Sequence, residues 1–288
     1  YFTQAHGYDF VELASPAEAL QSLVSVVKGF VLYDPSLRDS AVVALTVAGV
    51  HDAVPITAAQ LPLMHELGIP MAVNLTGVFD GWTSTQVFAW ARDKYWQVTS
   101  DSYIIWMGGA CAPYMRPGIA DWGVSQRAFF VDLSTAPPDM WPPTASEYEL
   151  ANELVGSMGP APLVMGWHSY CSPQDEEHTF TTLASQNGGR VHGLNTNPNL
   201  SFSNKVRLPA NYKFVNPASP PLTPAQRAAA LNSVVISLVQ TDGLGLGAWT
   251  KPGRGAIPYA WEVTLPDLQL QPALLAMFYA QATPKDFF

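Results

Sequence analysis

The sequence predicts an α/β protein built on parallel sheets. We expect a small Rossmann-like α/β part over residues 1–75, then a (β/α)8-barrel-like domain over 76–288 that lacks its last strand. Three observations support this: short apolar, β-branched runs alternate with helical segments, the links between them are short, and Ser-Pro, Thr-Pro and Gly mark helix ends. A doubly wound open sheet is the alternative architecture.

The N-terminal part begins with helix and strand signals in close succession. Ser15 and Pro16 begin a helix that reaches Val27 and ends at Gly29. Strands are expected at 30–33, 53–56 and 71–73, and a second helix at 58–67. The apolar run at 41–50 fits either a helix or a strand. No glycine-rich phosphate-binding motif is present, so this part is expected to be structural.

The second part continues the alternation with longer loops. Strands are expected at 103–107, 128–133, 162–167, 190–194, 234–239 and 257–263, with an uncertain one at 212–215. Helices are expected at 83–96, 145–155, 176–186, 225–231 and 273–281. Six strands and one uncertain strand, with helices between them, fit a barrel whose final strand is missing.

Composition excludes several classes of partner. The 288 residues carry 14 Lys and Arg against 23 Asp and Glu, a net charge of −9, and no basic cluster. Nucleic acid and anionic membranes are therefore not expected partners. No apolar run is long enough to span a bilayer. Only 13% of the residues are charged, so we expect other polar groups, glycans or an assembly to make the surface soluble.

The candidate site lies at the carboxyl ends of the expected strands, where parallel α/β architectures carry their chemistry. This edge collects Asp132, Trp167, His168, Asp242, Trp261 and Glu262. Asp242 follows the apolar run at 234–239 and precedes Gly243, so either it is a reactive carboxylate or it forms a plain Asp-Gly turn. His168 either lines the site or belongs to a surface loop. No cofactor or metal site is expected.

Cysteines and glycosylation signals point to an extracellular protein. Cys111 and Cys171 fit neither a zinc site nor a redox motif. Each falls four residues after an expected strand end, which favours a disulfide across the rim, with two inert thiols as the alternative. Asn74 and Asn199 begin Asn-X-Thr/Ser signals and are glycosylation candidates in a secreted eukaryotic protein. Because Tyr1 opens the chain without Met or a signal peptide, we expect a mature or trimmed product. The low charge and the two glycosylation signals suit a secreted, extracellular protein.

Several segments carry a resemblance in a consistent order. They are FVLYD at 30–34 with VALTVAG at 43–49, RAFFVDL at 127–133, VMGW at 164–167, NLS at 199–201, QTDG at 240–243 and ATPKDFF at 282–288. Together they resemble the GxGYxYP glycoside hydrolase family. The resemblance implies an α/β N-terminal part, a barrel-like C-terminal domain and sugar hydrolysis. Two departures stand out: Leu244 and Gly245 replace the second Asp and the Asn of the family's SDGDN element, and the chain stops at Phe288, before the GxGYxYP motif.

Three functions follow from these observations. Glycoside hydrolysis needs two carboxyl groups that face one sugar bond, and Asp242 and Glu262 fit best, with Asp132 as a third candidate. Trp167, His168 and Trp261 would bind the carbohydrate substrate. Because Leu244 removes an acidic residue, the alternatives are an inactive extracellular glycoprotein that self-assembles into a filament or surface layer, and a non-catalytic glycan-binding module.

Overall fold

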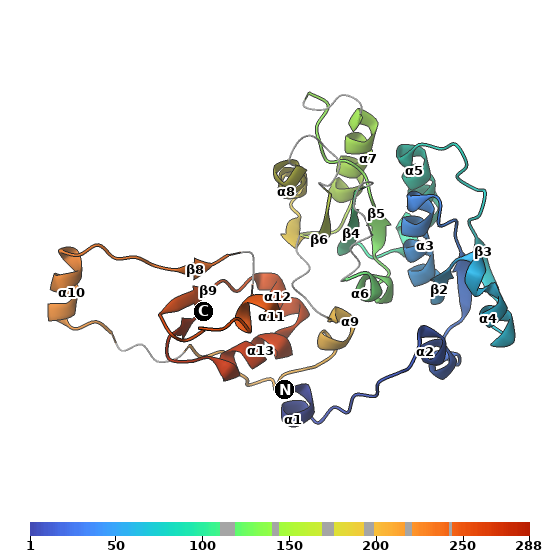
Figure 1. Cartoon of the computed structure of the whole chain (residues 1–288). Helices are drawn as coiled ribbons and strands as arrows, with labels where there is room; N and C mark the ends of the chain where they lie inside the picture. The colour runs from blue at the N-terminus through green and yellow to red at the C-terminus, as the bar shows by residue number, and fades with distance from the viewer. Residues whose placement is uncertain (110–118, 140–143, 169–175, 193–198, 217–220, 242–243) are drawn as a thin grey trace. The chain divides into compact units, whose positions relative to one another are not determined.

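The structure is a computed structural model of the chain. It describes residues 1–109, 119–139, 144–168, 176–192, 199–216, 221–241 and 244–288. The chain divides into two compact units, which we describe separately (Figure 1). The larger unit is Phe2–Asn195, and the smaller unit is Thr196–Phe288 together with Tyr1.

A three-stranded parallel sheet begins the larger unit. Its strands are β1 (Gly29–Leu32), β2 (Ala53–Ile56) and β3 (Met71–Asn74), in the order β2-β1-β3. Every residue of the central strand β1 is buried, and Phe30 and Leu32 pack with Met64 and Ile69 in a compact apolar cluster. The chain begins with the short helix α1 (Phe2–His6). The helices that follow are α2 (Pro16–Leu23), α3 (Arg38–His51), the 3-10 turn η1 (Ala58–Gln60) and α4 (Leu61–Glu66).

The run at 41–50, which sequence alone left open, forms most of helix α3. The helix contacts β1 and β2 on one side, and β5 and α6 of a second sheet on another. Burial on both sides explains why its residues are apolar all round and lack an amphipathic pattern. The Thr46 hydroxyl accepts a 2.9 Å hydrogen bond from the Phe130 N–H. Helix α3 therefore joins the two sheets of this unit.

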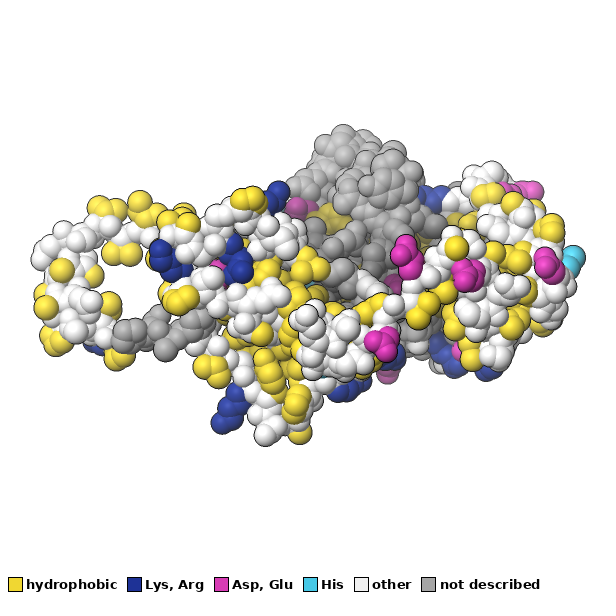
Figure 2. All heavy atoms as spheres, turned by 60° about the horizontal axis from the view of Figure 1, so that its bottom comes forward, with side chains coloured by type: hydrophobic (Ala, Val, Ile, Leu, Met, Phe, Trp, Pro, Cys, Tyr) yellow, Lys and Arg dark blue, Asp and Glu magenta, His cyan; other side chains and the backbone are white. Residues whose placement is uncertain are grey.

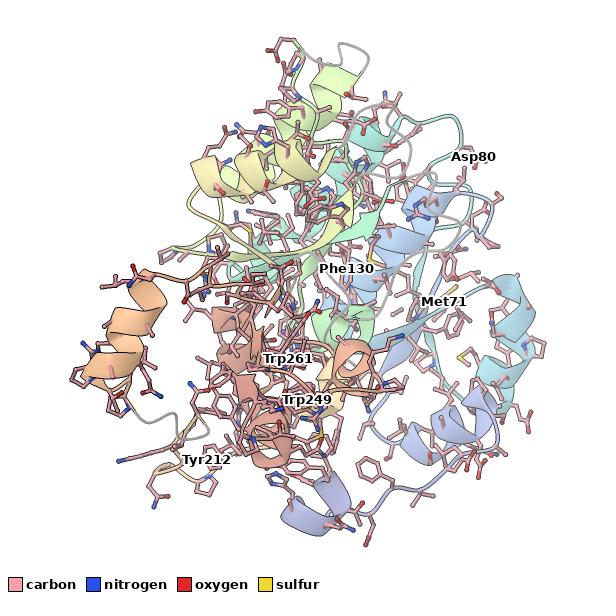
Figure 3. The ribbon with its side chains drawn as sticks, turned by 60° about the vertical axis from the view of Figure 1, so that its left-hand side comes forward. Met71, Asp80, Phe130, Tyr212, Trp249 and Trp261 are labelled. Atoms are coloured by element: carbon pink, nitrogen blue, oxygen red, sulfur yellow. The ribbon has the colours of Figure 1, made fainter. Side chains whose placement is uncertain are left out.

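The second sheet has four parallel strands in the order β5-β4-β6-β7. They are β4 (Tyr103–Gly108), β5 (Phe129–Val131), β6 (Leu163–His168) and β7 (Arg190–His192). The associated helices are α5 (Ser84–Tyr95), the 3-10 turn η2 (Trp96–Val98), α6 (Ala120–Ser125), α7 (Ala145–Gly156) and α8 (Glu176–Gln186). Phe130 lies in the fully buried core of this sheet (Figure 3).

The predicted barrel is not what the described residues form. Their strands make three separate parallel sheets of three, four and three strands. A barrel needs each strand to pair with the next one along the chain. Here the chain leaves β4 for β5 and then returns past β4 to place β6 on its other side, which is the reversal that defines a doubly wound sheet. The alternative architecture therefore describes this sheet.

The smaller unit holds a sheet of short strands in the order β10-β9-β8, again parallel. Its elements are α9 (Leu200–Ser203), α10 (Pro224–Leu231), β8 (Val239–Gln240), α11 (Leu246–Trp249), β9 (Tyr259–Trp261), α12 (Leu265–Leu270), α13 (Pro272–Gln281) and β10 (Asp286–Phe287). Trp249 and Trp261 meet edge to face at 5.0 Å in its core (Figure 3). No strand forms at 212–215.

A buried carboxylate near the C-terminus holds this unit together. Asp286 accepts hydrogen bonds from the Trp261 indole at 2.9 Å and from the Thr283 backbone N–H at 2.8 Å. It also forms a 2.7 Å ion pair with Arg254. Burial acts to raise the pKa of Asp286, but the hydrogen bonds from Thr283 and Trp261 and the charge of Arg254 outweigh it and keep that pKa low.

The prediction that residues 234–239 form a strand packed in the core is wrong. Only Val239 and Gln240 form a strand, and Val234 and Ile236 are 92% and 81% exposed. Hydrophobic side chains project along the segment between α10 and β8 (Figure 2). We call residues 231–239 the apolar arm. Periodicity identified its apolar character, but burial requires a packing partner. Among the described residues, β9 pairs with the arm at Val239, whereas Val234, Val235 and Ile236 stay exposed.

Candidate active site

Three strands of the four-stranded sheet end at one edge and bring polar groups together there. β4 ends in Gly108 and is followed by Gly109, β5 is followed by Asp132, and β6 ends in His168. Right-handed crossovers place α6 and α8, which follow β4 and β6, on opposite faces of the sheet. The β4–β6 pair is therefore the topological switch point, where open α/β sheets bind their ligands.

Asp132 is the centre of a buried hydrogen-bond network at this edge. Its Oδ2 accepts a 2.6 Å bond from Nε of Arg38, and its Oδ1 accepts a 2.7 Å bond from the Gly109 N–H. Arg38 also donates from Nη2 to the Met107 carbonyl oxygen at 2.7 Å. The Asp132 side chain is only 1% exposed. Both oxygens of Asp132 are occupied, so this carboxylate is poorly placed to attack a substrate.

Glycines make the close approach of β4 and β6 possible. Gly109 has φ +88°, and a Cβ at this position would lie 3.2 Å from Nε2 of the buried His168. Gly166 has φ +80°, and a Cβ there would lie 1.9 Å from the Trp106 carbonyl oxygen. Left-handed backbone beside a backbone contact this close requires glycine. The edge is thus shaped by residues without side chains.

Asp39 and Glu147 are the carboxyl groups in this region that the sequence did not single out. Asp39 follows Arg38 in the first turn of α3, and burial raises its pKa, with further increases from the charges of Asp132 and Glu147. A hydrogen bond with Ser84 and the charge of Arg38 oppose these effects. Glu147, in α7, accepts a 2.8 Å hydrogen bond from the Ser134 N–H.

The predicted site residues fall into two groups. Asp132, Trp167 and His168 lie at the edge just described, where the half-buried Trp167 ring is 5.3 Å from that of Phe180. Glu262 and Trp261 belong to the smaller unit. Glu262 is exposed, whereas Trp261 is buried beside Asp286.

The remaining predicted residues are exposed or outside the described ranges. Asp242, Cys111 and Cys171 lie outside the described residues, so the role of Asp242 and the disulfide stay predictions. Asn74 and Asn199 are exposed. The Asn74 Oδ1 accepts hydrogen bonds from the Thr76 backbone N–H at 2.9 Å and the Thr76 hydroxyl at 2.6 Å.

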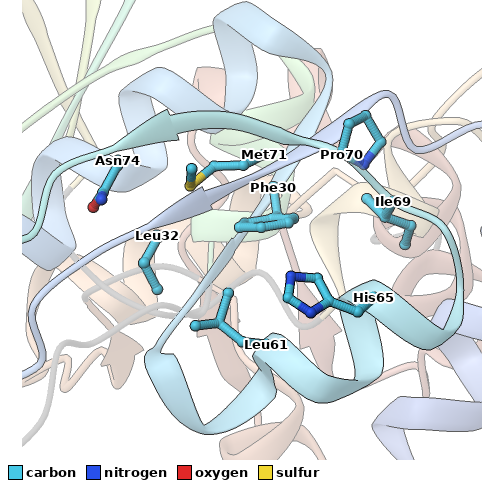
Figure 4. A pocket seen from close by; sticks show the side chains of 8 residues that line it. All are labelled: Phe30, Leu32, Leu61, His65, Ile69, Pro70, Met71 and Asn74. Carbon is cyan, nitrogen blue, oxygen red and sulfur yellow. The ribbon is translucent and has the colours of Figure 1, made fainter.

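Other features of the described residues do not form a competing site. A groove of about 460 Å³ lies between the first sheet and α4, lined by Phe30, Leu32, Leu61, His65, Ile69, Pro70, Met71 and Asn74 (Figure 4). It holds no carboxyl group and is suited to apolar contacts. Among the described residues, no cluster of three or more His, Cys, Asp or Glu side chains could hold a metal ion. No helix in the described ranges is long and apolar enough to cross a membrane.

Comparison with known proteins identifies relatives of most of the chain. Residues 27–99 match the model of the GxGYxYP_N second domain, and residues 101–205 match that of the GxGYxYP third domain. Residues 232–288 match the model described as "GxGYxYP putative glycoside hydrolase C-terminal domain". No curated protein matches the chain.

A solved structure has the same fold. A crystal structure described as that of a putative hydrolase from Bacteroides thetaiotaomicron superposes with a TM-score of 0.71 at 15% sequence identity. The match covers 100% of this chain and 53% of the other, so the chain spans about half the length of that protein. At this identity the likeness concerns the fold alone.

Proposed function

Because the chain belongs to the GxGYxYP family, we propose that it hydrolyses glycosidic bonds at the carboxyl edge of the β5-β4-β6-β7 sheet. The observation that carries the proposal is the placement of two carboxyl groups beside this edge, Asp39 in the first turn of α3 and Glu147 on the Ser134 N–H that follows β5. Burial raises the pKa of Asp39 there. Glycosidases use two carboxyl groups, one of which acts as the acid and has a raised pKa. Neither residue was a candidate from sequence.

The proposed reaction uses the two carboxyl groups on opposite sides of the sugar bond. Asp39 donates its proton to the glycosidic oxygen as the bond from that oxygen to C1 breaks. Glu147 assists the addition of water to C1, either by accepting a proton from that water or by first bonding to C1 itself. The half-buried Trp167 provides an aromatic surface for the sugar ring. The substrate in this proposal is a carbohydrate, and no cofactor is needed.

Asp132 has a different role in this scheme from the one expected from sequence. A nucleophile or base needs an oxygen that the substrate can reach, whereas both Asp132 oxygens accept N–H donors and the side chain is 1% exposed. The roles predicted for Asp242 and Glu262 are an independent possibility, since both lie in the unit that matches the family's C-terminal domain.

Turnover of a panel of aryl glycosides tests the proposal. We expect Asp39→Asn and Glu147→Gln each to lower kcat by about 10²–10⁴-fold. Asp93→Asn, which changes an exposed carboxylate on α5, is the matched control and should keep full activity. If Asp242→Asn or Glu262→Gln abolishes turnover while Asp39→Asn does not, the site is in the smaller unit. If the protein binds glycans but turns over none of the substrates, the proposal of catalysis is refuted and a glycan-binding function is supported instead.

We also propose that the protein is a secreted glycoprotein. Asn74 and Asn199 are both exposed in Asn-X-Thr/Ser signals, as glycosylation requires. Expression through a eukaryotic secretory pathway should yield a protein whose mass falls on enzymatic removal of N-glycans. Asn74→Gln and Asn199→Gln should each remove one glycan, and an unchanged mass in both variants would refute the proposal.

Self-association is a second candidate function, favoured by the apolar arm. Val234, Val235 and Ile236 are exposed next to β8, an edge strand, and no charged residue lies between Arg227 and Asp242. An exposed, uncharged, proline-free β-branched segment beside an edge strand can extend that strand and pair with another copy of itself. Light scattering should detect oligomers that Ile236→Asp dissociates. A wild-type protein that is monomeric at all concentrations would rule this function out.

A further inference from the structure

We propose that Arg38 and Asp132 form a latch that positions both the acid Asp39 and the two left-handed glycines where β4 ends, Gly108 and Gly109, which we call the glycine turn. Asp132 is then a positioning residue of the site. This inference rests on the proposed function where it concerns catalysis. Its structural part, the control of the turn and of Asp39, can be tested without any activity.

The latch holds three consecutive residues from both sides. Arg38 donates to the Met107 carbonyl oxygen at 2.7 Å, and Asp132 accepts from the Gly109 N–H at 2.7 Å. The 2.6 Å bond between Arg38 and Asp132 closes the network. The partners come from α3, β4 and the residue after β5, and Arg38 and Asp132 are 94 positions apart in the chain. Charge-assisted bonds of this length in a buried setting are the strong ones.

The turn that the latch holds faces His168. Gly108 and Gly109 have φ of +105° and +88°, a region that only glycine enters readily. The His168 ring packs directly against the bare Cα of Gly109, since a Cβ there would come within 3.2 Å of Nε2. Because glycines are also the most mobile residues of an unfolded chain, such a turn needs external bonds to keep one conformation. Asp132 and Arg38 supply them.

The latch also determines the surroundings of Asp39. Arg38 and Asp39 are neighbours in the first turn of α3, so anchoring Arg38 at the sheet edge anchors Asp39. The groups that act on the Asp39 carboxyl are Asp132 from the end of β5, Glu147 from α7, the Ser84 hydroxyl from α5, and Arg38 from its own helix. Burial is the largest effect on its pKa, and the Asp132 charge raises it further.

Asp132→Asn tests the latch, because Arg38 and the Gly109 N–H donate to different oxygens of Asp132 and asparagine replaces one of these oxygens with an NH2 donor. We expect amide hydrogen exchange at Gly109 to accelerate about tenfold or more. We also expect the pKa of Asp39, followed by NMR of its carboxyl carbon, to fall, because a negative neighbour is lost and the charge of Arg38 is no longer balanced. Glu153→Gln, which breaks the exposed Arg92–Glu153 pair, is the control and should change neither quantity.

Arg38→Lys provides a second variant should Asp132→Asn fold poorly. Lysine keeps the positive charge but lacks the planar fork that contacts Asp132 and Met107 together. Exchange at Gly109 should therefore still accelerate. Wild-type exchange at Gly109 in both variants, or a wild-type Asp39 pKa in Asp132→Asn, would overturn the latch.

Activity adds a separate readout. With Asp39 as the acid, the alkaline limb of the pH profile of kcat/KM should move to lower pH in Asp132→Asn, since the protonated acid is lost earlier. NMR changes as expected in a protein without glycosidase activity would leave the latch intact and refute the proposed function. Conversely, if the enzyme is active but Asp132→Asn changes neither exchange at Gly109 nor the pKa of Asp39, the latch alone is refuted.

Discussion

Gly166→Ala should be among the most destabilising single-methyl additions in the larger unit. Gly166 pairs with Trp106 in the β4–β6 ladder, and its added Cβ would lie 1.9 Å from the Trp106 carbonyl oxygen. No heavy atoms approach this closely without a bond, and the obstacle is backbone in the centre of a sheet. The two strands would have to separate locally.

The magnitude follows from two costs. Left-handed backbone at φ +80° costs alanine about 1–2 kcal/mol relative to glycine. Separating β4 from β6 weakens neighbouring ladder hydrogen bonds, each contributing about 0.5–1.5 kcal/mol. With two or three bonds affected, we expect a total loss of about 2–6 kcal/mol. Gly188→Ala is the matched control: it has φ +73° and nothing within 4 Å of its added Cβ, so it should cost only about 1–2 kcal/mol.

Urea unfolding of the two variants, with hydrogen exchange at the β4 amides, measures the difference. Exchange isolates the larger unit, so the smaller unit does not obscure the result. The Gly166→Ala variant should expose β4 amides at far lower free energy than Gly188→Ala. Equal losses in the two variants would show that left-handed strain alone matters, and would refute the argument from the close strand contact.

Three further predictions concern single groups. Thr46→Val leaves the Phe130 N–H buried without its acceptor and should lower the free energy of unfolding by about 1–3 kcal/mol in urea titrations, with a neutral outcome refuting the role of Thr46 in joining the sheets. Asp39→Asn should stabilise the protein at pH 7. The folded-state pKa of Asp39 lies above its unfolded value, so ionised Asp39 lowers the stability as pH rises past the unfolded pKa, and asparagine removes this loss. A less stable variant at pH 7 would contradict this. Asp286 has a lowered pKa, so its contribution to the free energy of unfolding is present above the unfolded pKa and is lost as pH falls through the folded pKa. Asp286→Asn should therefore make stability less dependent on pH in acid. An unchanged pH dependence would exclude this role.

Sequence was most informative where structure is local. Ser15, Thr83 and Thr223 each accept the N–H of the residue three positions later and begin the helices that their sequences predicted. These contacts lie within one turn, so residue identity at fixed spacing is sufficient. The apolar runs of β1, β4 and β6 were identified for a similar reason, since a short apolar run bounded by turn signals is typical of a strand.

The order of the strands in the sheets and the exposure of the apolar arm depend on which segments pack together, and a local sequence pattern does not predict this. Alternating strands and helices fit both a barrel and a doubly wound sheet, and only the return of β6 past β4 separates them. In the same way, Val234 and Ile236 have the composition of a buried strand, yet burial depends on whether another surface packs against them.

The candidate site shows the same division. From the sequence, Asp132 and His168 could be placed at strand ends, and parallel strands share a carboxyl edge, so their proximity was predictable. The sequence could not indicate that Arg38, 94 residues earlier, would donate a hydrogen bond to the Asp132 carboxylate. Nor could it indicate that burial would raise the pKa of Asp39 at the start of a helix. Protonation and hydrogen-bond partners depend on all neighbours in space, so they were decided by tertiary structure, whereas the strand ends were determined by the sequence itself.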